Sequence, residues 1–294
     1  MASSKSTTKT PAANATAVGP QSEADCRLIV AAGDKGATGK SFTMTQLIEW
    51  YLLRAQTLSL SVTDPDTKHR TLTRIFGAEG THPLAAPHRV ESVDFAGAEG
   101  MPLIDNVVRA FAVDPTARVS LVDGVANQFA DTMLRWARDV RLYELTEEYG
   151  FRVTYILMMD EMGVSVEQAR KLVSEVGDRA DYLVVRNCKK SFRVPWDTAA
   201  ADDLRKKVIE EFGGAEISLE GLSLDIFKLA DGQATGQLYS IRSIAEDRAC
   251  PADSFTRNRA ISAWARMLEQ FDAAARVVLP PNELNAFLTA RGVR

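Results

Sequence analysis

The chain has 294 residues, of which 46% are hydrophobic and 25% charged, as in an ordinary soluble globular protein. Its net charge of −4 and sequence pI of 5.6 exclude a global basic field that would draw the protein to nucleic acid. No apolar run approaches the ~20 residues of a membrane span, and the N-terminus lacks the apolar core of a secretory signal. The three cysteines are widely spaced and suit a reducing compartment, so we expect a cytoplasmic protein.

Composition divides the chain into two parts. Residues 1–24 are rich in Ser, Thr, Ala and Lys and have no hydrophobic period, which predicts a disordered N-terminal tail. This tail is interpreted either as a solvated leader or as an arm that binds a partner. Residues 25–294 alternate strand-like and helix-like patterns, and are predicted to form one domain with helices at its C-terminal end.

The strongest signal is a glycine-rich loop between a predicted strand and a predicted helix. Residues 28–32 have the length and apolar content of a buried strand, and hydrophobic residues recur with a helical period over 42–52. In this context the loop N–H groups and the helix N-terminus bind phosphate. Lys40 would reach the outer phosphates and Ser41 would supply a hydroxyl to Mg²⁺. The predicted nucleotide-binding residues of the loop are Gly36, Ala37, Thr38, Gly39, Lys40, Ser41 and Phe42.

Residues 35–41 read Lys-Gly-Ala-Thr-Gly-Lys-Ser, and Asp34 stands where the usual phosphate-binding pattern has its first glycine. With its second lysine near the start, this loop resembles the deviant Walker A motif of the ParA/MinD family of P-loop ATPases. The resemblance implies that Lys35 crosses a dimer interface to the partner's ATP. Ala37, Ser41 and a later switch loop without proline look more similar to the conjugal-transfer (TraL-type) branch.

A second strand, predicted at residues 57–63, ends at the turn Asp64-Pro65-Asp66. ParA-like proteins carry an Asp-Pro pair at the corresponding place in switch I, where the carboxylate helps to order the nucleophilic water or the magnesium shell. The resemblance therefore assigns Asp64 to catalysis, with Asp66 as the second choice. A plain surface turn is the alternative interpretation.

Two later strand ends supply further candidates. The strand at residues 118–124 closes on Asp123, a Walker B pattern in which the carboxylate holds magnesium through water. Asn127 and Gln128 follow it and would contact the γ-phosphate or a water. After the strand at 182–185 comes Asn187, which the resemblance places at the adenine edge, with a buried capping asparagine as the alternative.

The remaining pattern predicts an α/β fold with a single doubly wound, mostly parallel sheet flanked by helices, as in P-loop NTPases. Further strands are predicted at residues 90–93, 151–159 and 217–219, and helices at 71–76, 103–111, 133–149, 166–176, 199–212, 225–229, 254–271 and 282–290. Arg257, Arg259 and Arg266 are interpreted as a solvated basic face, with a polymer-binding surface as the alternative.

These features together imply an ATP-binding, Mg²⁺-dependent ATPase that dimerises on ATP and positions or loads a partner, as in plasmid partition or conjugal transfer. A protein activator is expected, with the N-terminal tail as a candidate contact, and nucleic-acid binding is left open. Two alternatives remain. One is a small-molecule kinase or ligase of dethiobiotin-synthetase-like topology, which would not need Lys35. The other is a nucleotide-binding scaffold with negligible turnover.

Overall fold

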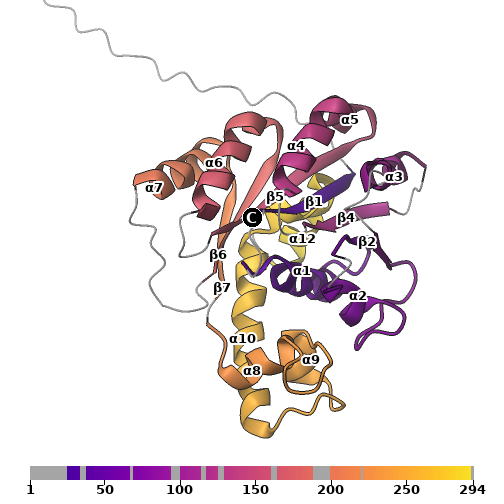
Figure 1. Cartoon of the computed structure of the whole chain (residues 1–294), viewed down its shortest axis with the longest axis vertical. Helices are drawn as coiled ribbons and strands as arrows, with labels where there is room; N and C mark the ends of the chain where they lie inside the picture. Colours follow the sequence, from indigo (N-terminus) through magenta and orange to yellow (C-terminus); the bar gives the residue numbers. More distant parts are fainter. Residues whose placement is uncertain are drawn as a thin grey trace, which may run out of the picture.

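The computed structural model describes residues 25–33, 38–66, 69–93, 100–113, 117–124, 129–159, 164–187, 199–219 and 221–292. At its centre is a seven-stranded sheet in the order β3-β2-β4-β1-β5-β6-β7, and every neighbouring pair is parallel (Figure 1). The predicted doubly wound parallel sheet is therefore confirmed. The strands are β1 (Cys26–Ala32), β2 (Ser59–Asp64), β3 (Arg89–Ser92), β4 (Ala117–Asp123), β5 (Phe151–Met159), β6 (Asp181–Asn187) and β7 (Ala215–Leu219).

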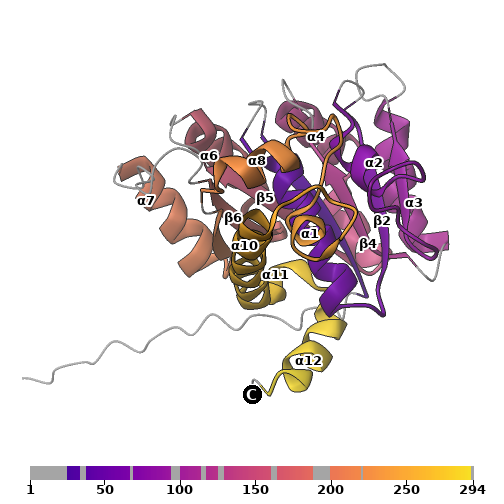
Figure 2. The same ribbon diagram turned by 90° about the horizontal axis from the view of Figure 1, so that it is seen from below.

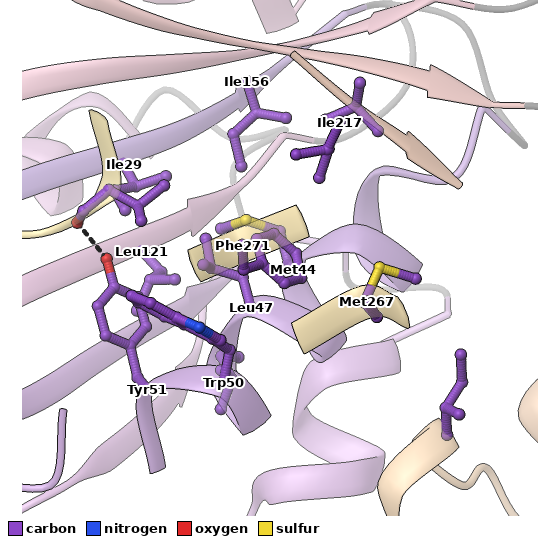
Figure 3. Close-up of a cluster of buried hydrophobic side chains, with 14 of the residues drawn as sticks. Ile29, Met44, Leu47, Trp50, Tyr51, Leu121, Ile156, Ile217, Met267 and Phe271 are labelled. Carbon is purple, nitrogen blue, oxygen red and sulfur yellow. Dashed lines mark hydrogen bonds between the residues drawn. The ribbon is translucent and has the colours of Figure 1, made fainter. Parts of the chain in front are cut away.

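One face of the sheet is covered by the first two helices and by helices from the C-terminal third of the chain. These helices are α1 (Lys40–Arg54), α2 (Thr71–Phe76), α8 (Leu224–Ala230), α9 (Ile241–Glu246), α10 (Ser254–Ala273) and α11 (Ala275–Val278). Side chains of β1 alternate between faces, so Ile29 points into this layer with Leu47, Trp50 and Phe271 (Figure 3). Figure 2 shows α1, α8 and α10 on this face.

The opposite face is covered by α3 (Gly100–Val113), α4 (Phe129–Asp139), α5 (Leu142–Glu148), α6 (Val164–Val176) and α7 (Ala199–Arg205). A π-helical segment, Lys206–Glu211, continues α7, and a 3-10 turn, Gly177–Arg179, follows α6. Leu28 and Val30 of β1 belong to this second core. Because both faces are buried, the central strands read as continuous apolar runs. The last helix, α12 (Pro281–Ala290), contacts α11.

The single helix predicted over residues 133–149 is wrong, because α4 ends at Asp139 and α5 begins at Leu142. Leu142 follows Met133 by nine residues, which is about two and a half helical turns. A straight helix would therefore point these two residues to opposite sides, whereas both are buried in the same core. Arg141, with a left-handed φ of 52°, makes the turn that brings Leu142 inward.

The predicted basic face on α10 is also wrong at Arg257. Its guanidinium is half-buried and donates to the main-chain carbonyls of Asp247 (2.7 Å) and Cys250 (3.0 Å). Arg257 thus closes the loop between α9 and α10 instead of facing solvent. Arg259 is exposed and keeps an ion pair, at 3.4 Å from Asp225. None of the helices in the described part of the chain is long and apolar enough to span a lipid bilayer.

The start of β1 is tied to the C-terminal segment by a buried arginine. Arg27 is 1% exposed, and its guanidinium donates to the carbonyl of Leu279 (2.6 Å) and the carboxylate of Asp181 (2.6 Å). Asp181 also accepts from Arg152 (2.7 Å), which is 25% exposed on its side chain. The buried charge of Arg27 is tolerated because its N–H groups are hydrogen-bonded. Removing the guanidinium would leave several buried acceptors without partners.

We expect Arg27→Met to lower the free energy of unfolding by about 2 to 4 kcal/mol, because it orphans buried acceptors of the strand and of the C-terminal segment. Arg152→Met, a matched change on the same Asp181, should cost less than about 1 kcal/mol, since Arg152 is partly solvated. Urea denaturation measures both values. Equal losses in the two variants would contradict the anchoring role of Arg27.

Candidate functional site

The order of the strands brings three functional segments to one edge of the sheet. β4 lies between β2 and β1, with Ala31 opposite Asp123 and Thr63 opposite Val122. The carboxyl ends of β2, β4 and β1 therefore lie side by side, and they deliver Asp64, Asp123 and the loop that enters α1. The chain builds β2, β3 and β4 on one side of β1 and β5, β6 and β7 on the other, so this edge is a topological switch point, where open α/β sheets bind ligands.

The second half of the predicted loop begins α1. Lys40 is the first residue of the helix, and its side chain is 6% exposed and close enough to Asp123 to lower that acid's pKa. The first turn of α1 has no acidic residue, and its N-cap, Gly39, has no side chain that could cap the helix. The N-terminus of a 15-residue helix thus keeps its positive potential beside a lysine, which favours an anion.

Gly39 and Asn187 fix the course of the loop. Gly39 has a left-handed φ of 95°, and a Cβ there would lie 2.8 Å from Nδ2 of Asn187. The same Nδ2 donates to the main-chain carbonyl of Thr38 at 2.6 Å. Asn187, at the end of β6, therefore holds the backbone of the loop, which fits the capping interpretation. Its contact with adenine stays a prediction.

Some predicted residues fall outside the described part of the chain. They are Lys35, Gly36 and Ala37 of the loop and Asn127 and Gln128 after β4. Ser41 and Phe42 are described and half-buried at the start of α1, and Phe42 packs against the core of that layer.

Asp123 is the most strongly perturbed acid of the site. It is 2% exposed, and burial raises the pKa of its carboxyl to about 7. A hydrogen bond with Ser41 and the charge of Lys40 oppose this rise, whereas the charge of Asp64 adds to it. Ser41 and Asp123, the two predicted metal ligands, therefore lie close to each other.

The donor set fits magnesium. Oδ1 of Asp123 is buried and has no hydrogen-bond partner among the described residues, so an oxygen ligand is available there. A hydroxyl and a carboxylate are the hard oxygen ligands that Mg²⁺ uses, with water and phosphate oxygens in its other positions. Within the described ranges no group of three His, Cys, Asp or Glu could enclose a metal, so this site would depend on a nucleotide for further ligands.

Asp64 lies beside Asp123 with both its oxygens engaged. Oδ2 accepts from the N–H (2.9 Å) and the hydroxyl (3.1 Å) of Thr73, and Oδ1 accepts from the N–H of Asp66 at 3.3 Å. Burial raises the pKa of Asp64, and these hydrogen bonds oppose the rise. The sequence analysis missed Thr73. The available signal was a threonine in the first turn of a helix that follows a strand-terminal aspartate.

No protein-family model and no curated protein matches the chain. Solved structures that resemble it include a chain of the MinC:MinD cell division protein complex of Aquifex aeolicus, at 12% identity and a TM-score of 0.43, covering 83% of this chain and 96% of that one. FtsY from Mycoplasma mycoides resembles it at 10% identity and a TM-score of 0.38, covering 65% and 58%. Likenesses this distant leave the function to be argued from the residues of the site.

The raised pKa of Asp123 predicts how the variant Asp123→Asn behaves with pH. Between about pH 4 and pH 7 the folded protein holds a proton that the unfolded chain has lost, so this acid's contribution to stability falls as pH rises through that window. At pH 8 we expect Asp123→Asn to raise the free energy of unfolding by about 1 to 3 kcal/mol, because it removes a buried charge.

At pH 5 the same variant should be nearly neutral, because the wild-type acid is already protonated. Thermal unfolding at both values measures the difference, and the exposed Asp178→Asn is the matched control. The same change in stability at pH 5 and at pH 8 would contradict a buried carboxylate with a pKa of about 7.

Proposed function

We propose that the chain binds Mg²⁺-ATP at the loop after β1 and hydrolyses it slowly, as a nucleotide-dependent switch. The observation that carries this proposal is the closeness of Ser41 and the buried Lys40, at the N-terminus of α1, to the buried carboxylate of Asp123. A lysine and a helix N-terminus suit phosphates, and the adjacent hydroxyl and carboxylate suit the metal that accompanies them. These parts meet where an open parallel sheet binds its ligands.

Each residue has a distinct task in this reaction. The N–H groups at the start of α1 and the ammonium of Lys40 hold the phosphates, while Ser41 and Asp123 hold the metal. Asp64 orients a water for attack on the γ-phosphorus, which yields ADP and inorganic phosphate. Magnesium at this position would neutralise part of the charge on the phosphate oxygens. The loop is held in place by Asn187, which is also the residue proposed to contact the adenine edge.

Slow turnover follows from the charge of the transition state, which needs more than one cation. We infer that Lys35 of a second copy supplies it, as the resemblance to the ParA/MinD loop implies. ATP would then join two copies and hydrolysis would separate them. The two states would differ in their binding of a protein partner, which the protein positions or loads. Plasmid partition and conjugal transfer are the cargo classes proposed, with the TraL-type branch as the finer assignment.

Nucleotide binding is tested by titrating fluorescent ATP into the full chain with Mg²⁺ or with EDTA. We expect Mg²⁺-dependent binding that Lys40→Ala weakens by at least about tenfold, because a charge-assisted contact is lost. Lys228→Ala, at an exposed lysine of α8, is the matched control and should bind like wild type. Wild-type protein that binds no ATP, or binds it equally well after Lys40→Ala, would overturn the proposal.

The switch is tested by light scattering with ADP, with ATP, and with ATP on Lys35→Ala. We expect a dimer with ATP only, and a monomer for the variant, since the proposed cation would no longer reach the partner's phosphates. Lys228→Ala should dimerise like wild type. A monomer in every condition would reject the dimer and favour the small-molecule kinase. ATP binding without release of inorganic phosphate, measured separately, would favour the nucleotide-binding scaffold.

A further inference from the structure

The acid proposed to orient the water is held by a helix that belongs to no phosphate-binding motif. Thr73 lies in the first turn of α2 and directs both its N–H and its hydroxyl to the same oxygen, Oδ2 of Asp64, at 2.9 Å and 3.1 Å. The second oxygen, Oδ1, accepts one longer bond, 3.3 Å from the N–H of Asp66. A carboxylate oxygen has two lone pairs, so Oδ1 retains one for a water.

Helix α2 and the loop after it are also held by the segment between α8 and α9. Arg74 donates to the carbonyl of Gly236 at 2.6 Å, and Thr81, in the loop after α2, donates to the carbonyl of Leu238 at 2.6 Å. The apolar side chains of Leu72, Ile75 and Phe76 are buried in the core shared with α1. Thr73 therefore binds Asp64 from a helix that cannot move without breaking these contacts.

We propose that Thr73 is a positioning residue, which fixes the rotamer of Asp64 so that Oδ1 faces the attacking water. This inference rests on the proposed ATPase function and assigns a role to a residue outside every motif of the chain. Without the two donors, Asp64 would retain the longer bond from the N–H of Asp66 and would rotate more freely about its side-chain bonds. The attacking water would then be oriented in only a fraction of the ATP-bound complexes, which would lower kcat without lowering the affinity for ATP.

The same bonds can also be interpreted as a cap of α2 without a role in hydrolysis, and this alternative predicts a different result. Arg70, the N-cap of α2, provides no side-chain cap among the described residues, and the Asp64 carboxylate accepts the N–H of Thr73 instead. If these bonds served only to cap α2, loss of the Thr73 hydroxyl would change the stability of the protein and leave the kinetic constants unchanged. The separation of kcat from KM distinguishes the two readings.

The test compares Thr73→Val, Thr73→Ser and Thr71→Val in single-turnover and steady-state ATP hydrolysis by the full chain. Thr73→Val removes the hydroxyl at nearly constant shape, and Thr73→Ser retains it. Thr71→Val is the matched control, since among the described residues nothing pairs with the hydroxyl of Thr71. We expect Thr73→Val to lower kcat by about tenfold or more, with KM and ATP affinity within about twofold of wild type.

Thr73→Ser should restore kcat to within about threefold, and Thr71→Val should match wild type. Circular dichroism and thermal unfolding verify the fold, and Thr73→Ala carries the same expectation if the valine variant is misfolded. A wild-type kcat in Thr73→Val, or an equal loss in Thr73→Ser, would overturn the positioning role alone. Wild-type protein that hydrolyses no ATP would instead overturn the proposed function.

Discussion

The site depends on the pairing of β4 between β1 and β2. The register that places Ala31 opposite Asp123 puts the metal-binding candidate beside the start of α1, and Thr63 opposite Val122 brings Asp64 next to it. A slip of one residue would turn every side chain of β4 to the opposite face. The two apolar cores exclude such a slip, because Leu121 and Val122 are each buried against a different helical layer.

This arrangement brings two buried acids close together. Burial raises the pKa of both Asp64 and Asp123; at Asp123 the charge of Asp64 adds to the rise and the charge of Lys40 opposes it. Buried carboxylates are unfavourable unless hydrogen bonds or cations satisfy them. Asp64 is satisfied by Thr73, whereas Oδ1 of Asp123 has no hydrogen-bond partner among the residues that the structure describes. Stability is thus given up at the acid proposed to bind a metal, as is usual where function and packing compete.

The strands and the loop were predictable because they depend on local patterns. The apolar run of β1 and the residues Gly39, Lys40 and Ser41 carry their signal within a few positions. Thr73 and Arg257 do not, because their partners are set by where α2 packs and by how the loop before α10 closes. The break between α4 and α5 could not be predicted either, because it depends on which side of the two helices faces the core. Lys35 lies outside the described residues, so its role remains a prediction.

A third buried carboxylate helps to fix the position of α1 relative to α2. Glu49 of α1 is fully buried, and its oxygens contact His82 (2.9 Å) from the loop after α2, Ser240 (2.6 Å), the N-cap of α9, and Arg242 (3.2 Å) of α9. Leaving such a charge unpaired is strongly unfavourable. Any ligand that shifts α2 relative to α1 must stretch these contacts, so Lys40 and Ser41 on one helix and Thr73 on the other are held in register through α9.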